Sequence, residues 1–233
     1  MSVDKDMRDQ LSSIRILDIS TNNTIYIPCT KILIAAGAWS PQVFATLFPS
    51  SNYKLPISSL AGHSLVVRSP RWTKTDENGD QGCHAVFSID EDGYSPEIFS
   101  RMGEEIYIAG LNSSSIPLPT LATESQIDKK SIESLKKTAK RLLGNQIEST
   151  EDLEIIREGL CFRPVTSKGV PILAQIQDEK LGGMKTRDCG ESGVFLAAGH
   201  GPWGISNSLG TGKVMSEIIM GKETSVKVDG LRF

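Results

Sequence analysis

Two short apolar runs, each followed directly by a glycine, constrain the fold of this chain more than any other feature. Residues 32–36 (ILIAA) precede Gly37, and residues 194–198 (VFLAA) precede Gly199. An unbroken apolar run of this kind is typical of a strand that is buried on both faces, in a sheet covered by helices. We therefore predict two doubly buried strands near the two ends of the chain, packed in one layer.

A helix is predicted after each of these strands. The first covers residues 41–47, with Ser40 as its N-cap and Pro41 at its first position, because serine and proline favour these two places. The second covers residues 202–220, and Gly221 ends it. Each predicted strand therefore leads through a glycine turn into a helix.

The remaining strands are predicted to be antiparallel. Near the N-terminus, two alternating runs flank a polar turn at residues 21–24 and indicate a hairpin. In the middle of the chain, Gly, Pro and Asp separate four short alternating segments: GHSLVVRSP, CHAVFSI, EIFSRM and EEIYIAGL. Two more strands surround a turn at residues 167–169. The fold class is therefore mixed α/β, with an antiparallel layer inserted into the layer that the chain ends form.

An amphipathic helix follows the middle strands. Apolar residues recur at near-helical spacing through residues 125–143. Thr123 and Gln126 have the spacing of a capping box, and Gly144 directly follows the last apolar position. We therefore predict a single helix that begins near residue 125 and ends at Gly144.

Composition argues against several classes of function. The formal net charge is −3, so no nucleic-acid footprint is expected. The polar N-terminus and the lack of a long apolar run argue against a signal peptide and a membrane span. No metal site is expected, because the four cysteines include no C-x-x-C pair: Cys29, Cys83, Cys161 and Cys189. We expect a cytoplasmic protein in a reducing compartment.

Gly199, Gly201 and Gly204 form a G-x-G-x-x-G motif. A dinucleotide fingerprint also needs a second strand about twenty residues later, ending in an acid for the ribose, and the remaining chain is too short for it. A P-loop is excluded as well, because Asn207 and Val214 stand where a glycine and a Ser/Thr are required. Two interpretations remain: a strand-to-helix turn whose amides favour negative charge, or a tight turn that packs helix on strand.

Four separated blocks resemble the family of FAD-dependent oxidoreductases that includes D-amino-acid oxidase, glycine oxidase and monomeric sarcosine oxidase. KILIAAGAWSP (31–41) resembles the family's strand and AAGAWS turn, which pass the dinucleotide. GLCFRPVTSKGVPIL (159–173) resembles its RPxTxDGxPiiG segment, and VFLAAGHGPWGISNSLGTGKVMSEII (194–219) its closing AGHGxxG strand and helix. SPEIFSRMGEEIYIAGLN (95–112) resembles the sheet element between them. The blocks follow the family's order, and the GHGPWG form is most similar to a fungal branch.

The resemblance implies the C-terminal portion of a glutathione-reductase-like FAD-binding fold, with an inserted antiparallel substrate-domain sheet. Residues 1–60 and 156–233 would belong to the FAD-binding domain, and residues 61–155 would form the substrate domain with one helix. The implied cofactor is FAD. In such enzymes the closing turn lies by the pyrimidine edge of the flavin, where amides of residues 201–205 would stabilise negative charge. The implied cofactor-binding residues are Ala36, Gly37, Ala38, Trp39, Gly199, His200, Gly201, Pro202, Trp203, Gly204 and Ile205.

The implied chemistry is hydride transfer from a small amine or amino-acid substrate to flavin N5. Arg163 is the implied catalytic-site residue, because a guanidinium can bind a substrate carboxylate through two hydrogen bonds. Binding of backbone carbonyls near the flavin is the alternative role of Arg163. Cys161 lies near the position at which monomeric sarcosine oxidase holds flavin covalently, and a small core cysteine is the alternative.

The sequence departs from the family at its start. The family opens with a βαβ unit that carries G-x-G-x-x-G and a ribose-binding acid, and these 233 residues contain no counterpart. Ser167 and Lys168 also replace the usual Pro-Asp before Gly169. We expect either a truncated form of a flavoenzyme or a non-catalytic relative that acts as a binding or trafficking component. Unrelated small-molecule binding is a third hypothesis. Uncovered strands in a truncated form predict poor solubility or loose packing.

Overall fold

The computed structural model describes residues 1–78, 84–89, 93–145, 152–187 and 190–233. It contains two compact units: unit 1 is formed by Met1–Ser59 and Arg163–Phe233, and unit 2 by Leu60–Phe162. Unit 2 is thus inserted into unit 1, with its ends at residues 60 and 162, where the sequence suggested 61 and 155. The assignment of the units to an FAD-binding and a substrate domain stays a prediction. Cys83 and Cys189 lie outside the described residues.

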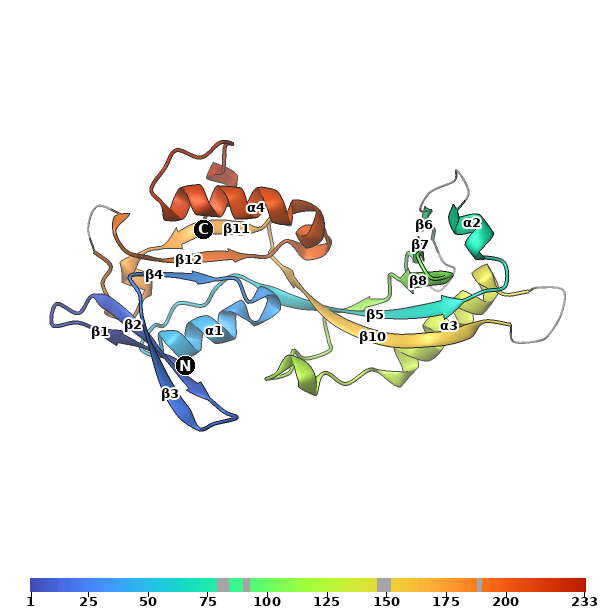
Figure 1. Ribbon diagram of the computed structural model, residues 1–233, viewed down its shortest axis with the longest axis horizontal. Helices are drawn as coiled ribbons and strands as arrows, with labels where there is room; N and C mark the ends of the chain where they lie inside the picture. Colours follow the sequence, from blue (N-terminus) through green and yellow to red (C-terminus); the bar gives the residue numbers. More distant parts are fainter. Residues whose placement is uncertain (79–83, 90–92, 146–151, 188–189) are drawn as a thin grey trace. The chain divides into compact units, whose positions relative to one another are not determined.

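The centre of unit 1 is a three-stranded sheet in the order β11–β12–β4 (Figure 1). Strand β4 (Lys31–Ile34) runs parallel to β12 (Gly193–Ala198), and Leu33 lies opposite Phe195. Strand β11 (Ile172–Ile176) is antiparallel to β12 on the other side. The two apolar runs of the sequence are therefore direct neighbours, although most of the chain separates them.

Helices cover the two faces of this sheet to different extents (Figure 1). Helix α1 (Ser40–Leu47) packs on one face in a core that includes Phe44, Ile34 and Leu196. Helix α4 (Gly204–Ile219) lies on the other face, where its Val214 and Met215 pack with Leu173 of β11 and Phe195 of β12.

Leu33 shows that the cover on the α4 side is incomplete. Its register with Phe195 places it on the face that α4 covers, yet it is 43% exposed. The apolar core under α4 includes residues of β11 and β12 but none of β4 in the part of the chain that the structure describes. The prediction of a doubly buried strand is therefore confirmed for β12 and wrong for β4.

A second sheet of unit 1 has the order β1–β2–β3. Its strands are β1 (Ser2–Lys5), β2 (Leu11–Asp18) and β3 (Asn23–Pro28). Strands β2 and β3 are antiparallel with Asp18 opposite Asn23, which confirms the predicted hairpin. Hydrogen bonds from Ser20 and Thr21 in the turn lower the pKa of Asp18 to about 2.

The starts of the two helices differ from the prediction in detail. Ser40 is the first residue of α1 and Trp39 its N-cap, with no side-chain hydrogen bond. The prediction of Ser40 as N-cap is therefore wrong, because a 3-10 turn, η1 (Gly37–Trp39), leads directly into the helix. A similar turn, η5 (Gly201–Trp203), precedes α4. Gly221 lies just beyond the C-terminal end of α4 and has a φ of +66°.

Unit 2 contains the predicted antiparallel layer, with strand order β10–β5–β8–β7–β6 and β9 paired to β5. Strand β5 pairs with β8, β8 with β7 and β7 with β6, and all three pairs are antiparallel. The strands are β5 (Ser58–Arg68), β6 (Ala85–Phe87), β7 (Glu97–Arg101), β8 (Glu105–Ala109), β9 (Asn112–Ser113) and β10 (Glu154–Val165).

Helix α3 (Lys129–Leu143) packs against this sheet through a core that includes Ile132, Leu135 and Ile108. Its N-cap is Asp128, whose carboxylate accepts a hydrogen bond from the amide of Ser131 at 2.9 Å. The predicted capping box of Thr123 and Gln126 is therefore wrong, since the chain at residues 122–124 forms a separate 3-10 turn. Gly144 ends the helix as predicted.

The remaining helical segments are short. They are α2 (Lys74–Asn78), η2 (Ala122–Glu124), η3 (Asp178–Lys180) and η6 (Asp229–Leu231). Within the described ranges, every helix is too short or too polar to cross a lipid bilayer.

Candidate functional site

Both glycine turns lie at the same end of the central sheet of unit 1. Leu196 of β12 lies opposite Ile34 of β4 in parallel register. The chain therefore leaves the two strands side by side and turns into η1 and α1 in one case and into η5 and α4 in the other (Figure 1). The fold thus brings together two turns that lie far apart in the sequence, and the parallel register of their strands places them at one end of the sheet.

Gly37 determines the backbone conformation of the first turn. Its φ is +55°, in the left-handed region that side chains other than glycine avoid. A Cβ placed on Gly37 would have no atom within 4 Å, so the space beside it is open. The carbonyl of Ala36 accepts a hydrogen bond from the amide of Trp39 at 3.0 Å. Ala38 is buried beneath the turn, and Trp39 is half-buried.

The second turn contains two glycines with different roles. A Cβ on Gly199 would lie 2.6 Å from Cγ2 of Thr166, so this glycine is required for close packing. Gly201 has a φ of +57°, and a Cβ there would have no atom within 4 Å. A Cβ on Gly204 would make only an ordinary contact with the Cβ of His200, at 3.7 Å. The space beside Gly201 is therefore open, as it is beside Gly37.

The residues that follow Gly201 expose apolar side chains. Pro202 and Trp203 are exposed, and Ile205 is 92% exposed on the first turn of α4. Leu209, one turn further along, is 90% exposed. The N-terminal half of α4 therefore presents an apolar surface that no other part of the described chain covers.

The two helix starts share an electrostatic property. Neither α1 nor α4 has a side-chain hydrogen bond at its N-cap or an acidic residue in its first turn. Within the described residues, the positive end of each helix dipole therefore lacks these two common sources of compensation. In the same part of the chain, Oγ of Ser40 is buried without a hydrogen-bond partner at the start of α1. Such an arrangement favours a ligand with negative or hydrogen-bond-accepting groups.

His200 lies in the second turn, and its ring is directed back to α4. Its Nε2 is 2.9 Å from Oγ1 of Thr211. The ring is half-buried, and this burial lowers the pKa of His200 below its usual 6.5. His200 is therefore a neutral imidazole near pH 7.

Arg163 belongs to the same unit as the two turns and lies near the end of β10, where it is half-buried. It is three residues before Thr166, the residue that packs against Gly199. Its role as a substrate-binding residue stays a prediction. Cys161 is exposed in unit 2, and its thiol lies 3.5 Å from the carbonyl of Gly62. The exposure contradicts a buried core cysteine, and covalent attachment of flavin at Cys161 stays a prediction.

Three residues of this region were not recognised from the sequence: Ser40 as a buried polar group, Thr166 and Thr211. Thr166 stands in a segment that carries the family resemblance, but its contact with Gly199 joins two turns that are distant in sequence. Thr211 lies between two helical glycines, Gly210 and Gly212. That G-T-G pattern is a local signal of an unusual helix position, because glycine weakens a helix interior.

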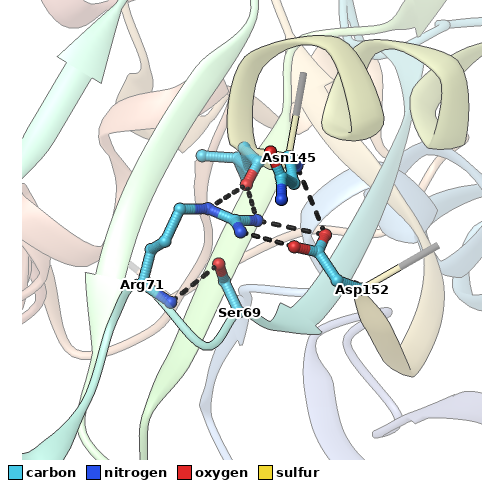
Figure 2. Close-up of polar contacts among 5 residues, drawn as sticks. Ser69, Arg71, Asn145 and Asp152 are labelled. Carbon is cyan, nitrogen blue, oxygen red and sulfur yellow. Dashed lines mark hydrogen bonds and ion pairs between the residues drawn. The ribbon is translucent and has the colours of Figure 1, made fainter. Parts of the chain in front are cut away.

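Unit 2 holds a separate polar cluster around Arg71, which Figure 2 shows. The Arg71 guanidinium donates hydrogen bonds to the carbonyl of Leu143, at the end of α3, and forms an ion pair with Asp152. Asp152 also accepts a weak hydrogen bond from the amide of Asn145, at 3.4 Å. The cluster satisfies a helix C-terminus and pairs all its charges, so it has the character of a structural clamp.

Comparison with protein families gives one match over most of the chain. The family model described as FAD dependent oxidoreductase matches residues 7–218. A Schizosaccharomyces pombe protein named as an oxidoreductase is 30% identical over 202 residues, which are 86% of this chain and 44% of that protein. D-amino acid dehydrogenase of Neisseria meningitidis is 24% identical over 200 residues, 86% of this chain and 39% of its own length.

Solved structures show the same fold. Glycine oxidase from Geobacillus kaustophilus superposes with a TM-score of 0.62 at 19% identity, over 95% of this chain and 50% of that chain. The chain therefore spans about half, or less, of the length of the proteins that it matches.

Proposed function

Because the chain belongs to the family of FAD-dependent oxidoreductases, we propose that the two glycine turns of unit 1 hold part of an FAD molecule. The observation that carries this proposal is the pair of helix starts without side-chain caps at one end of a parallel strand pair. FAD is the cofactor in the description of the family. The proposed activity is oxidation of an amine or amino acid in the protein that contains this chain.

The residues of the two turns fit a flat, electron-rich ligand. Gly37 and Gly201 both have positive φ, and the space in which a Cβ would project is open at both. A ring system can therefore approach the backbone at these positions. Packing explains Gly199 but not these two glycines. The open space at Gly37 and Gly201 thus leaves room for a ligand beside each turn.

The bound flavin would supply a hydride acceptor for substrate oxidation. The chain's own contribution is electrostatic and positional. The amides at the start of α4, near Gly204 and Ile205, favour negative charge on the adjacent edge of a ring system, since they lie at the positive end of the helix. The turn at residues 36–39 would contact the dinucleotide through its amides, as the family resemblance implies. Trp203, exposed beside these amides, would form a wall of the pocket.

Arg163 is the proposed substrate-binding residue. A guanidinium forms two parallel hydrogen bonds with a carboxylate, which selects a substrate that carries one. An amino acid is the simplest such substrate, and the names of the D-amino acid dehydrogenase and glycine oxidase relatives describe enzymes that act on amino acids. Binding of backbone carbonyls by Arg163 is the alternative, and a test that separates the two is given in the Discussion.

A second candidate function is a non-catalytic relative that binds a partner. The observation that favours it is the exposure of apolar side chains in unit 1, Leu33 on β4 and Ile205 and Leu209 on α4, because exposed apolar groups are suited to contact another polypeptide. These exposed side chains also support the prediction of poor solubility. The two candidates differ in whether substrate reduces the flavin.

The test is an FAD titration of the purified chain, followed by flavin fluorescence and by the visible absorption band. We expect saturable quenching and a shifted band, and unchanged spectra at every FAD concentration would contradict the cofactor proposal. The loaded protein is then given amines and amino acids anaerobically. Bleaching of the flavin supports the oxidoreductase, whereas bound flavin that no substrate bleaches favours the non-catalytic relative.

A further inference from the structure

The hydrogen bond between His200 and Thr211 joins the turn to the second turn of α4. His200 lies before the helix begins at Gly204, so that its ring has to fold back along the helix to come within 2.9 Å of Oγ1 of Thr211. A contact of this length between a ring nitrogen and a hydroxyl is a hydrogen bond, in which one of the two groups is the donor and the other the acceptor. Which atom donates determines the chemistry of the turn.

The surroundings of Thr211 leave its hydroxyl able to act as the donor. Helical hydroxyls commonly donate to a carbonyl three or four residues earlier. Ser208 and Ser216 of α4 do so, at 2.8 and 2.7 Å, and Thr46 of α1 does so at 2.9 Å. For Thr211, the hydrogen-bond partner within the described chain is the ring of His200 instead. No helical carbonyl there competes for the hydroxyl proton, so this proton is available to Nε2.

In a neutral imidazole ring, an Nε2 atom that accepts a hydrogen bond carries no proton of its own. The imidazole proton of His200 then resides on Nδ1, which makes Nδ1 a hydrogen-bond donor. The ring is only half-buried, so part of it remains accessible to a ligand. The lowered pKa that burial gives to His200 is consistent with a single ring proton near pH 7.

We propose that Thr211 is a positioning residue that holds His200 as the Nδ1–H tautomer, so that His200 offers a fixed hydrogen-bond donor to an oxygen of a ligand in the turn. This proposal rests on the proposed function, because the ligand it concerns is the flavin. Its chemical requirement is an anionic or carbonyl oxygen. A fixed donor costs less reorganisation on binding than a ring that must choose its tautomer.

The first test is NMR of the chain labelled with ¹⁵N-histidine, without any flavin. The sequence has three histidines, and the variant H200N assigns the signals of His200. In the wild-type chain we expect a protonated Nδ1 and an unprotonated Nε2. The variant T211V should shift His200 toward the Nε2–H form, whereas T211S, which keeps the hydroxyl, should restore the wild-type pattern. T46V is the matched control, because it removes a helical hydroxyl that donates to its own helix.

The second test is FAD affinity of the same variants. Loss of one fixed donor should weaken binding about five- to tenfold in T211V, with recovery in T211S and no change in T46V. A wild-type His200 that carries its proton on Nε2, or a tautomer unchanged in T211V, would overturn the positioning role even if FAD binds. A tautomer that responds as expected while FAD fails to bind at all would overturn the ligand-binding role and the proposed function, but leave the contact with Thr211 established.

Discussion

The Nε2 atom of His63, a residue that is 1% exposed in unit 2, accepts a hydrogen bond from the amide of Asp128 at 3.1 Å. The other ring nitrogen, Nδ1, is buried without a hydrogen-bond partner in the described chain. Asp128 is also the N-cap of α3. A buried imidazole on β5 is thus hydrogen-bonded to the start of the helix that covers the sheet, and protonation of Nε2 would break this hydrogen bond.

We expect the stability of the chain to fall as the pH decreases below 6.5. Burial lowers the pKa of His63 from its usual 6.5, and the nearby Asp128 carboxylate only partly opposes this effect. The unfolded chain therefore binds more protons than the folded chain in this range, so the contribution of His63 to the free energy of unfolding is present above pH 6.5 and is lost as the pH falls through its lowered pKa. Urea unfolding at several pH values measures the slope. H63Q should reduce the slope to the part that other groups such as His200 contribute, while a substitution of the exposed His84 should leave it unchanged; a slope in H63Q equal to that of the wild type would contradict the role of His63.

Asp128 is predicted to stabilise α3 through its cap. In D128A the amide of Ser131 loses the carboxylate that accepts its hydrogen bond, and loss of a cap of this kind lowers the melting temperature by about 3–8 °C. T123A is the control, since Thr123 lies outside α3 and does not cap it. Melting curves followed by circular dichroism provide the measurement. Equal effects of the two substitutions would show that Asp128 acts in some other way.

Gly201 is predicted to contribute to FAD binding, and Gly221 is predicted not to contribute. Both have positive φ, +57° and +66°, and a Cβ on either would meet no atom within 4 Å. An alanine at either position therefore strains the backbone to a similar extent, but Gly201 lies before α4 and Gly221 after it. G201A should weaken FAD binding about tenfold, whereas G221A should leave it unchanged. Equal losses of affinity would indicate a general effect of strain and remove Gly201 from the proposed site.

Arg163 is predicted to select substrates that carry a carboxylate. R163L should raise the KM for an anionic substrate about 10- to 100-fold, with a much smaller change for an uncharged amine. R163K keeps the charge without the two-pronged geometry and should lie between wild type and R163L. Steady-state kinetics of the flavin-loaded protein provide the measurement. An equal rise of KM for both substrates would favour the backbone-binding role.

Arg71 is predicted to stabilise unit 2 more than a typical surface arginine. It binds the carbonyl of Leu143 as well as Asp152 (Figure 2), whereas within the described residues Arg68 forms two ion pairs, at 3.6 and 4.0 Å, and no hydrogen bond to a carbonyl. R71A should therefore lower the melting temperature by about 3–5 °C and R68A by about one degree or less. High salt should reduce the ion-pair contribution but not the bond to the carbonyl. A larger loss in R68A would contradict the clamp.

Several features of the fold followed from local patterns in the sequence. The apolar run before Gly199 predicts a buried strand, and β12 is one. The glycine turn after it predicts a helix, and α4 follows. Alternating segments predict the strands of the unit 2 sheet, and the end of α3 at Gly144 agrees with the prediction. These features depend on the spacing of apolar residues and on backbone preferences within one segment, and both can be read from the sequence of that segment.

What the sequence alone determined is therefore the series of strand, glycine turn and helix, and the membership of its motifs in a flavoprotein family. Tertiary structure decided the rest. The parallel register of β4 and β12 placed the two glycine turns at one sheet end. Incomplete cover by α4 left Leu33 exposed on a strand whose apolar composition predicts burial. Two hydrogen bonds join residues whose proximity cannot be predicted from a local sequence pattern. One links His200 and Thr211, and the other runs from the amide of Asp128 to the ring of His63. Such contacts depend on how distant segments pack, and hydrophobic spacing alone carries no information about their register.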